Sequence, residues 1–371
     1  MAMSQNTPGV VAELDTPSLL VDLDRMQANI DRMAKIAREA GVALRPHAKT
    51  HKTPQIGRLQ VAAGSPGLTV AKLGEAEVFA GAGITDLFIA YPQWGEIKWE
   101  RLCALARHAT LRVAADSYEG LEGLSRVAAR HGLRILVRLE VDSGYGRTGM
   151  QSIEEVRALA RRAERLPGVE LVGLMGYGGQ AGKETEREAI RRVAREEGQG
   201  LVAVAEALRA DGFAVPELSA GGTPTGPHVA AVPGITEIRP GTYVFSDRTQ
   251  ATRSWGDLDG CALSVLVTVV SRPTRTRAIV DGGSKTFTSE RPPYLEGFGA
   301  VRGHPEYEFS WLTEEHGMLT VPADADLPVG TRLQVIPNHV CVTVNLHDRL
   351  FAIRGERVED VWPIAARGRV Q

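Results

Sequence analysis

The stretch RPHAKTHK, residues 45–52, places several basic side chains at the end of a predicted strand. It follows a short apolar run and precedes a proline, which is the pattern of a buried strand that ends in a loop. If residues 43–49 are extended, Arg45, His47 and Lys49 lie on one face, because side chains alternate along a strand. Burying such groups is costly unless an anion or a cofactor accompanies them. Considered alone, the KTHK part of the motif is more typical of a solvated basic loop.

Length and composition exclude several classes of protein. A chain of 371 residues suggests two domains, or one barrel with an appendage. The formal net charge of −2 gives no basic surface for nucleic acid. No apolar stretch reaches membrane-spanning length, and the N-terminal MAMSQNTPGV lacks the features of a signal peptide. Three scattered cysteines are too few for a disulfide framework. We therefore expect a cytoplasmic protein with neither nucleic acid nor membrane as a partner.

Extended and helical patterns alternate along the first two thirds of the chain. Helical patterns separate predicted strands over residues 16–23, 43–49, 67–72, 86–92, 110–116, 133–141, 171–177 and 216–222. A last extended piece covers 235–245. Eight such repeats predict an α/β fold of the (β/α)₈ TIM-barrel type. An open doubly wound sheet is the alternative, but no G-x-G-x-x-G follows the first strand.

The remainder of the chain is rich in strand patterns and nearly free of helical periodicity. This change predicts a separate all-β domain. We place the barrel at residues 14–252 and the β domain at 253–371, with residues 1–13 adding a strand to the second.

Glycine- and threonine-rich segments follow the last strands of the predicted barrel. In such barrels the active site lies at the carboxyl ends of the strands, and a phosphate is often held after strands seven and eight. SAGGTPTG (219–226) and RPGTY (239–243) have the composition of phosphate-binding loops, although each is also compatible with ordinary turns. An inward lysine opposite such loops indicates a Schiff base to pyridoxal phosphate.

A second candidate site lies in PNHVCVTVNLHD, residues 337–348. In an extended segment, His339 and Cys341 point the same way and form half of a metal site. Thiolate with imidazole favours zinc over magnesium, and two protein ligands leave positions for water and substrate. A half-buried strand with a core cysteine is the alternative.

Seven motifs, in chain order, together resemble the D-threonine aldolase/D-serine dehydratase family. They are RPHAKTHK, GEAE, EVDSGYGRTG, SAGGTPT, EIRPGTYVF, EEHG and PNHVCVTVN. The resemblance covers roughly residues 14–369. It implies a fold-type III pyridoxal phosphate enzyme, with an alanine-racemase-like barrel followed by the β domain. It further implies a homodimeric lyase that acts on β-hydroxy-D-amino acids.

The resemblance also assigns roles to residues of this sequence. Lys49 becomes the Schiff-base lysine and catalytic residue, with Lys52 as the second candidate. A divalent metal on the β-hydroxyl side of the substrate is held by His339 and Cys341; zinc is favoured, and manganese and magnesium are the alternatives. Tyr177 lies beside the pyridine ring and Arg147 near the phenolic oxygen. The remaining cofactor-binding residues are His47, Gly221, Gly222, Thr223, Gly241 and Thr242.

Within the family, the motifs point to two reactions. His339-x-Cys341 and SAGGTPT are typical of the dehydratases, which form a 2-oxo acid and ammonia from D-serine or 3-hydroxy-D-aspartate. The C-terminal run NLHD…VEDVWPIAARGR resembles the aldolases, which form glycine and an aldehyde. Gly178 occupies the position of a histidine proposed as the base in some aldolases. Both reactions remain open, and an amino acid racemase or a non-catalytic pyridoxal phosphate carrier are further alternatives.

Overall fold

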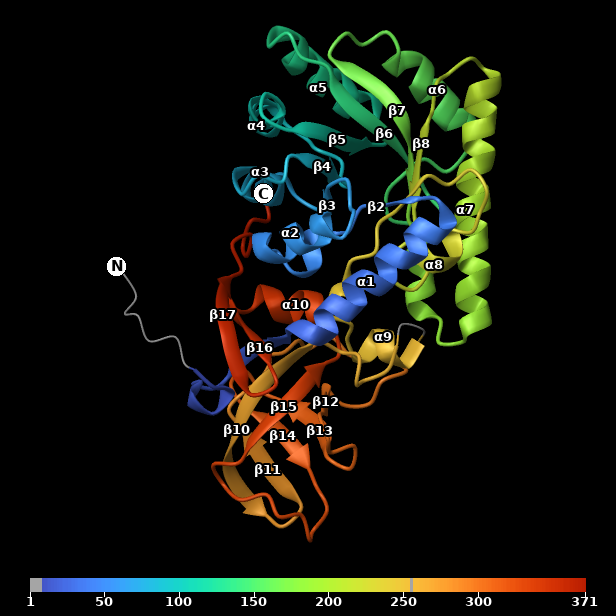
Figure 1. Ribbon diagram of the computed structural model, residues 1–371. Coiled ribbons are helices and arrows are strands. Elements are labelled where there is room, and N and C mark those ends of the chain that lie inside the picture. The colour runs from blue at the N-terminus through green and yellow to red at the C-terminus, as the bar shows by residue number, and fades with distance from the viewer. Residues whose placement is uncertain (1–8, 254–255) are drawn as a thin grey trace. The chain divides into compact units, whose positions relative to one another are not determined.

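The computed structural model describes residues 9–253 and 256–371, which divide into two compact units (Figure 1). The unit that contains the parallel sheet comprises Asp31–Lys49, Pro54–Gly241 and Gly368–Gln371. Of the described residues, the unit that contains the mostly antiparallel sheet comprises 9–30, Thr50–Thr53, 242–253 and 256–367. We call them the barrel unit and the β unit.

The barrel unit is built on eight parallel strands in the order β2-β9-β8-β7-β6-β5-β4-β3. A parallel bridge between His47, just beyond β2, and Thr69 of β3 closes the sheet on itself. This arrangement confirms the predicted TIM-type barrel. The strands are β2 (Ala43–Leu44), β3 (Leu68–Val70), β4 (Asp86–Ile89), β5 (Thr110–Ala115), β6 (Ile135–Val141), β7 (Val169–Gly176), β8 (Glu217–Ala220) and β9 (Glu237–Ile238).

Helices follow most of these strands and cover the outside of the sheet (Figure 1). α6 shows why they form: Ser152 and Glu155 make a capping box at its start, and its apolar residues at helical spacing are buried. The helices are α1 (Leu23–Ala40, which begins in the β unit), α2 (Pro54–Ala62), α3 (Leu73–Gly81), α4 (Glu96–Ala106), α5 (Tyr118–Arg130), α6 (Ile153–Ala163), α7 (Arg187–Ala210) and α8 (Gly226–Val229). Two 3-10 helices, η2 (Ala48–Thr50) and η3 (Gly179–Lys183), follow β2 and β7.

A closed ring of ion pairs fills part of the barrel interior. Each of three arginines bridges two acids, in the order Arg45, Asp86, Arg112, Glu217, Arg138, Glu237 and back to Arg45. Arg138 is the largest fully buried side chain of the described residues, and Glu237 is also buried. Buried charges are tolerated only when they are paired and hydrogen-bonded, so equal numbers of the two signs explain how polar side chains occupy this interior. Arg45 therefore belongs to the ring, where Asp86 and Glu237 neutralise it.

The β unit contains a nine-stranded sheet in the order β11-β14-β13-β12-β15-β10-β1-β16-β17. Because β11 also pairs with β10, the strands from β10 to β15 form a closed ring. The strands are β1 (Ser18–Asp22), β10 (Leu263–Thr274), β11 (Arg277–Val280), β12 (Gly299–Val301), β13 (Glu308–Leu312), β14 (Gly317–Thr320), β15 (Arg332–Pro337), β16 (Arg349–Arg354) and β17 (Arg357–Pro363). The unit also carries η4 (Thr242–Val244), α9 (Arg248–Arg253) and α10 (Val340–Asn345).

Two strand predictions were wrong in detail. The strand expected over residues 16–23 exists as β1, but it pairs with β10 and β16 in the β unit and not with a barrel strand. The eighth barrel strand is β9, which lies in the last extended piece of that half. The extension expected over 43–49 is interrupted, since η2 begins at Ala48. Alternation along a segment reveals that it is a strand but not which strand will be its neighbour.

The sequence also predicted a strand at the start of the chain and no membrane-spanning segment. An extra strand was expected over residues 1–13, of which residues 1–8 lie outside the described residues. Val10 forms a single antiparallel bridge with Arg357, and Val11–Glu13 form a short 3-10 helix, η1. Among the described residues, no helix combines the length and the apolar character that crossing a membrane requires.

Candidate active site

The barrel unit contains a cavity of about 370 Å³ at the carboxyl ends of its strands. Five of the predicted cofactor residues line it: His47, Lys49, Arg147, Tyr177 and Gly221. The other lining residues are Ala71, Ala90, Tyr91, Pro92, Thr148, Met175 and Arg239. Segments from seven different strand ends therefore converge on one hollow, as expected for the active site of this architecture.

Lys49 and His47 reach the cavity because the chain changes conformation after β2. The N–H of His47 still donates to the carbonyl of Pro240 at 2.9 Å, and η2 then turns Lys49. His47 is half-buried, and burial, Lys49 and Arg239 hold its pKa well below its ordinary value, so its imidazole is neutral at pH 7. Among the described residues, its buried Nδ1 has no hydrogen-bond partner. Lys52, the second candidate lysine, belongs to the β unit.

Arg147 and Tyr177 meet over the same cavity. The Arg147 guanidinium lies 4.9 Å from the centre of the Tyr177 ring, and Tyr145 packs edge-on against that ring with centroids 5.7 Å apart. The loop that carries Arg147 is held by Asp142, whose carboxylate accepts the backbone N–H groups of Gly144, Tyr145 and Gly146. The glycines of SGYGRTG thus shape a loop that presents one cation beside one aromatic ring.

The loop after β8 is tightly packed. Gly221 has φ +80°, and a Cβ there would lie 2.9 Å from the Cα of Gly226, so the position requires glycine. The N–H of Gly221 donates to Glu197 Oε1 at 2.7 Å, and that of Gly222 to Thr225 Oγ1 at 2.9 Å. A phosphate bound to the N–H of Gly222 would therefore have to replace the Thr225 hydroxyl.

The other three predicted phosphate residues occupy different places. Thr223 is buried in the loop after β8. Gly241 ends the barrel segment of the chain, and Thr242 begins η4 in the β unit. The carbonyl of Thr242 accepts the N–H groups of Phe245 and Ser246. These residues do not line the cavity of the barrel unit.

Arg239 is a cavity residue that sequence reasoning did not assign. It is buried, with Nη1 donating to Ser219 Oγ at 2.5 Å and Nη2 to the carbonyl of Gly176 at 2.6 Å. Burial lowers its pKa to about 10, so it remains a cation at neutral pH. It lies in the RPGTY motif, but nothing in that motif indicates that its side chain enters the barrel. Tyr91, at the end of the fourth predicted strand, also lines the cavity and had no role assigned from the sequence; the Lys72 amine lies 3.7 Å from the centre of its ring.

The lining of this cavity suits an anionic cofactor with an aldehyde. It offers an amine, two guanidinium groups and a buried imidazole nitrogen for which residues 9–253 and 256–371 supply no hydrogen-bond partner. Nearby, burial raises the pKa of Glu140, whose Oε1 accepts the Thr148 hydroxyl at 2.7 Å. Pyridoxal phosphate combines a phosphate, a phenolic oxygen and an aldehyde that condenses with lysine, so the donor set fits this group.

The predicted metal pair lies in the β unit. His339 is the residue before α10 and Cys341 lies in its first turn, so the expected extended segment was wrong. The two side chains nevertheless lie next to each other. Burial alone would lower the pKa of His339, but Cys341 and Asp247 beside it outweigh burial and raise that pKa. The Cys341 Sγ lies 3.3 Å from the Thr50 hydroxyl. Within the described ranges, no group of three or more His, Cys, Asp or Glu side chains is arranged around a metal position, so the site would rest on two protein ligands.

Comparison with known proteins places the chain. Residues 21–249 match the family described as "Alanine racemase, N-terminal domain", and residues 262–353 match a serine dehydratase domain. The chain is 38% identical to a D-threonine aldolase of Arthrobacter sp, over 96% of this chain and 94% of that protein. The chain belongs to the D-threonine aldolase/D-serine dehydratase family. A D-threo-3-hydroxyaspartate dehydratase of Delftia sp. (strain HT23) is 35% identical, over 89% of this chain and 92% of that protein.

Solved structures of this family have the same fold. The D-threonine aldolase from Filomicrobium marinum superposes with a TM-score of 0.93 at 30% identity, covering 99% of this chain and all of that one. The Delftia dehydratase gives 0.90 at 33% identity, covering 96% and 99% of the two chains. A cysteine-to-alanine variant of that dehydratase is described in a metal-free form. An alanine racemase from Bacillus anthracis, at 16% identity and a TM-score of 0.69, shares the fold alone.

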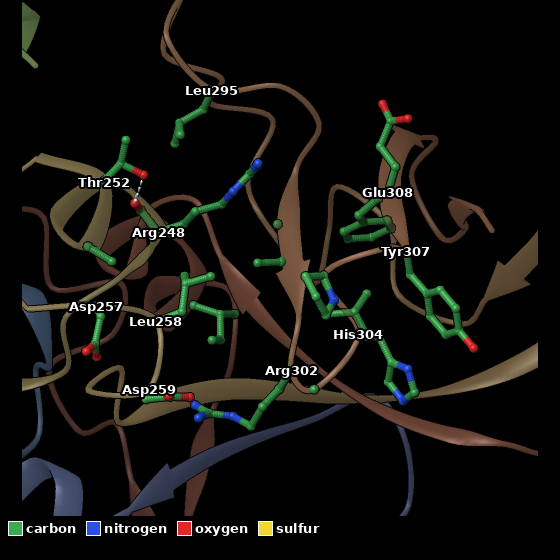
Figure 2. A pocket seen from close by; sticks show the side chains of 18 of the residues that line it. Arg248, Thr252, Asp257, Leu258, Asp259, Leu295, Arg302, His304, Tyr307 and Glu308 are labelled. Carbon is green, nitrogen blue, oxygen red and sulfur yellow. Dashed lines mark hydrogen bonds between the residues drawn. The ribbon is translucent and has the colours of Figure 1, made fainter. Parts of the chain in front are cut away.

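A second hollow of about 800 Å³ lies in the β unit (Figure 2). Arg248 and Arg302 reach into it together with acidic side chains, among them Asp257 and Asp259. Arg248 is already bonded to the carbonyl of Glu296, and Arg302 to that of Cys261 at 2.7 Å. The hollow contains none of the predicted site residues, and its charges are mixed.

Proposed function

We propose that the protein is a pyridoxal phosphate- and divalent-metal-dependent lyase of β-hydroxy-D-amino acids. The proposed reaction is of the D-threonine aldolase type and yields glycine and an aldehyde. One observation carries this proposal: five residues chosen from sequence motifs as cofactor ligands line a single cavity at the carboxyl ends of the barrel strands. The relatives with the same fold include aldolases and dehydratases of β-hydroxy-D-amino acids.

The residues of the cavity would hold the cofactor as follows. Lys49 would bind its aldehyde carbon, Arg147 its phenolic oxygen, and Tyr177 would lie beside its ring. Of the residues that the sequence motifs assign to its phosphate, Gly221 lines the cavity. Gly222, Thr223, Gly241 and Thr242 lie outside that lining, and their role stays a prediction. When bound, the cofactor supplies an electron sink that stabilises negative charge at the substrate Cα.

The chain's own charges would prepare the cavity for this ligand. Arg239 is a buried cation, and burial strengthens its electrostatic attraction to an anion. The Arg147 side chain is exposed, so solvent weakens its attraction. His47 is neutral, and its Nδ1 has no hydrogen-bond partner in the part of the chain that the structure describes, so it can bond to the cofactor without adding charge. The buried Arg239 is held by hydrogen bonds to Ser219 and the carbonyl of Gly176, so its guanidinium has a fixed position in the pocket.

A divalent metal is the second proposed component, with His339 and Cys341 as its ligands and zinc as the favoured ion. A metal at this pair supplies Lewis acidity toward a hydroxyl group. In the chain, the residue next to Lys49 is Thr50, whose hydroxyl contacts the Cys341 thiol. The metal-free cysteine variant of the Delftia dehydratase supports this assignment by analogy.

Dehydration to a 2-oxo acid and ammonia is the second candidate function. The His339–Cys341 pair favours it, because this pairing is typical of the dehydratases in the family. The two reactions differ in the proton that leaves first. Aldol cleavage begins at the β-hydroxyl oxygen, whereas dehydration begins at Cα, where the Lys49 amine would accept the proton.

Two assays test this proposal together: one asks which enantiomer of threonine is consumed, and the other asks whether turnover requires a metal. We expect the protein with pyridoxal phosphate and zinc or manganese to consume D-threonine and not L-threonine. Chelation by EDTA should abolish turnover, and added metal should restore it. Full activity after chelation would overturn the metal assignment, and equal consumption of both enantiomers would overturn the substrate class.

We further propose that the protein is a cytoplasmic homodimer. Light scattering of the holoprotein after size-exclusion chromatography tests its assembly, since the sequence mass is 40.0 kDa per chain. A monomeric mass would contradict this part of the proposal.

A further inference from the structure

Asp247 is a fully buried carboxylate beside the proposed metal ligand His339. Its Oδ1 accepts the backbone N–H of Gln250 at 2.8 Å, and its Oδ2 accepts that of Val340 at 3.1 Å. The Nδ1 of His339 lies 3.2 Å from the same Oδ2. Both oxygens of the carboxylate thus serve as acceptors, and the imidazole is the only side chain among these three partners.

The contact selects one tautomer of His339. An oxygen that already accepts a backbone N–H requires a donor at the imidazole Nδ1, so Nδ1 carries hydrogen. In the neutral ring, Nε2 then keeps the lone pair that a metal needs. Carboxylates that orient metal-binding histidines in this way raise the basicity of the ligand and fix the plane of its ring.

The turn that carries His339 is held on its other side as well. The carbonyl of Asn338 accepts the N–H of Thr249 at 3.2 Å and the Thr249 hydroxyl at 2.7 Å. The Asn338 amide accepts from Arg248 at 3.2 Å and donates to the carbonyl of Gly297 at 3.0 Å. Since α9 begins directly after Asp247, the same short helix fixes both the carboxylate and the histidine turn.

We infer that Asp247 is the positioning residue of the metal site. It holds Nδ1–H of His339 and thereby presents Nε2, beside the Cys341 thiol, to a divalent cation. The inference rests on the proposed function, because it assumes that His339 and Cys341 bind a metal. It adds a residue that does not itself contact the metal or the substrate.

The test measures zinc affinity in the cofactor-loaded protein by competition with a chromophoric chelator. In Asp247→Asn, an NH₂ group replaces one of the two carboxylate oxygens. In one orientation it faces the backbone N–H of Gln250, and in the other it faces that of Val340 and the His339 imidazole, so one acceptor is lost in either case. When it faces His339, it donates to Nδ1 and places the hydrogen on Nε2. We expect zinc affinity to fall by about 10- to 100-fold.

Asp281→Asn is the matched control. Asp281 also lies in the β unit and accepts a backbone N–H, from Thr268 at 2.8 Å, and a hydroxyl, from Thr16 at 2.5 Å. Its substitution removes a comparable carboxylate far from His339 in sequence, and zinc affinity should not change. Circular dichroism and the visible band of the bound cofactor report whether each variant is folded.

The outcomes separate this inference from the proposed function. Zinc binding by Asp247→Asn as tight as that of the unmodified protein would overturn the role of Asp247 and leave the metal site standing. Failure of the unmodified protein to bind zinc, or equal binding by Cys341→Ala, would overturn both.

A measurement on the unmodified chain keeps the inference falsifiable if Asp247→Asn does not fold. In zinc-loaded protein with ¹⁵N-labelled histidines, the signals of residue 339 are assigned by their loss in His339→Gln. We expect a protonated Nδ1 and a zinc-bound Nε2. Zinc on Nδ1 would overturn the inference.

Discussion

The Glu197 carboxylate, in the middle of α7, accepts the N–H of Gly221 at 2.7 Å, and its other oxygen lies 2.4 Å from the position that a Cβ on Gly178 would occupy. This buried acid therefore lies against the loops after both β7 and β8, which carry Tyr177 and Gly221. Burial raises the pKa of Glu197, while the N–H groups of Gly221 and Gly178 partly offset that rise. The glycine at position 178 is thus a packing requirement of this chain.

Gly178→Ala should destabilise the protein by about 1–3 kcal/mol, because the new Cβ must displace the Glu197 carboxylate or the loop. We expect weaker binding of pyridoxal phosphate as Tyr177 shifts, measured by cofactor titration and urea unfolding. Gly182→Ala is the control, since a Cβ there meets nothing within 4 Å. Equal effects of the two substitutions would contradict this account. For the same reason, Gly178→His should not create a base for aldol cleavage.

Lys49→Ala should abolish the visible absorbance band that pyridoxal phosphate acquires when it is bound to lysine. Lys52→Ala should retain the band, because only Lys49 of the two lines the cavity. Absorbance spectra after dialysis against the cofactor give the answer. Survival of the band in Lys49→Ala would show that a different lysine binds the cofactor.

Cys341→Asp should change the preference of the metal site. A carboxylate oxygen is a harder ligand than a thiolate, so affinity should shift from zinc toward manganese and magnesium. The ratio of zinc to manganese dissociation constants is the measurement. Cys261→Ala is the control in the same unit, where burial raises the thiol's pKa to about 12 and the sulfur remains protonated. An unchanged ratio in Cys341→Asp would argue against this cysteine as a ligand.

Glu237 should make the stability of the barrel depend on pH. Burial alone would raise its pKa, but Arg138 and Arg45 hold it well below the ordinary value of 4.5. Its contribution is therefore complete above that value and is lost as the pH falls below it toward the depressed pKa. Glu237→Gln should destabilise the fold at neutral pH by about 3–5 kcal/mol, because it leaves buried arginines underpaired.

Urea unfolding from neutral to acidic pH checks this prediction. Stability should fall less steeply with acid in Glu237→Gln than in the unmodified protein. Glu39→Gln, which removes an exposed pair with Lys35, should change little. Parallel acid profiles for the unmodified protein and Glu237→Gln would contradict the role of the ring.

The sequence predicted much of the fold and of the cofactor cavity because both depend on local patterns. Strand ends are visible as changes of periodicity, and barrel geometry brings them together, so Lys49, Arg147 and Tyr177 meet although they are far apart in the chain. Their individual roles stay predictions. The partner of a strand is a property of the whole sheet, which explains why β1 was placed in the wrong one.

What the sequence did not predict depends on contacts distant in the chain. Arg45 was expected beside Lys49, but Asp86 and Glu237 draw it into the ion-pair ring. Arg239 enters the cavity only because the carbonyl of Gly176 and Ser219 fix its guanidinium there. No spacing rule encodes such pairs.

The identity of the products from D-threonine tests the central claim most directly. We would follow uniformly ¹³C-labelled D-threonine by NMR in the presence of the protein, pyridoxal phosphate and zinc or manganese. The account predicts labelled glycine and acetaldehyde, with 2-oxobutanoate and ammonia as the outcome if dehydration is the reaction. D-threonine that stays intact, or that only epimerises at Cα, would contradict the assignment of this chain as a β-hydroxy-D-amino acid lyase.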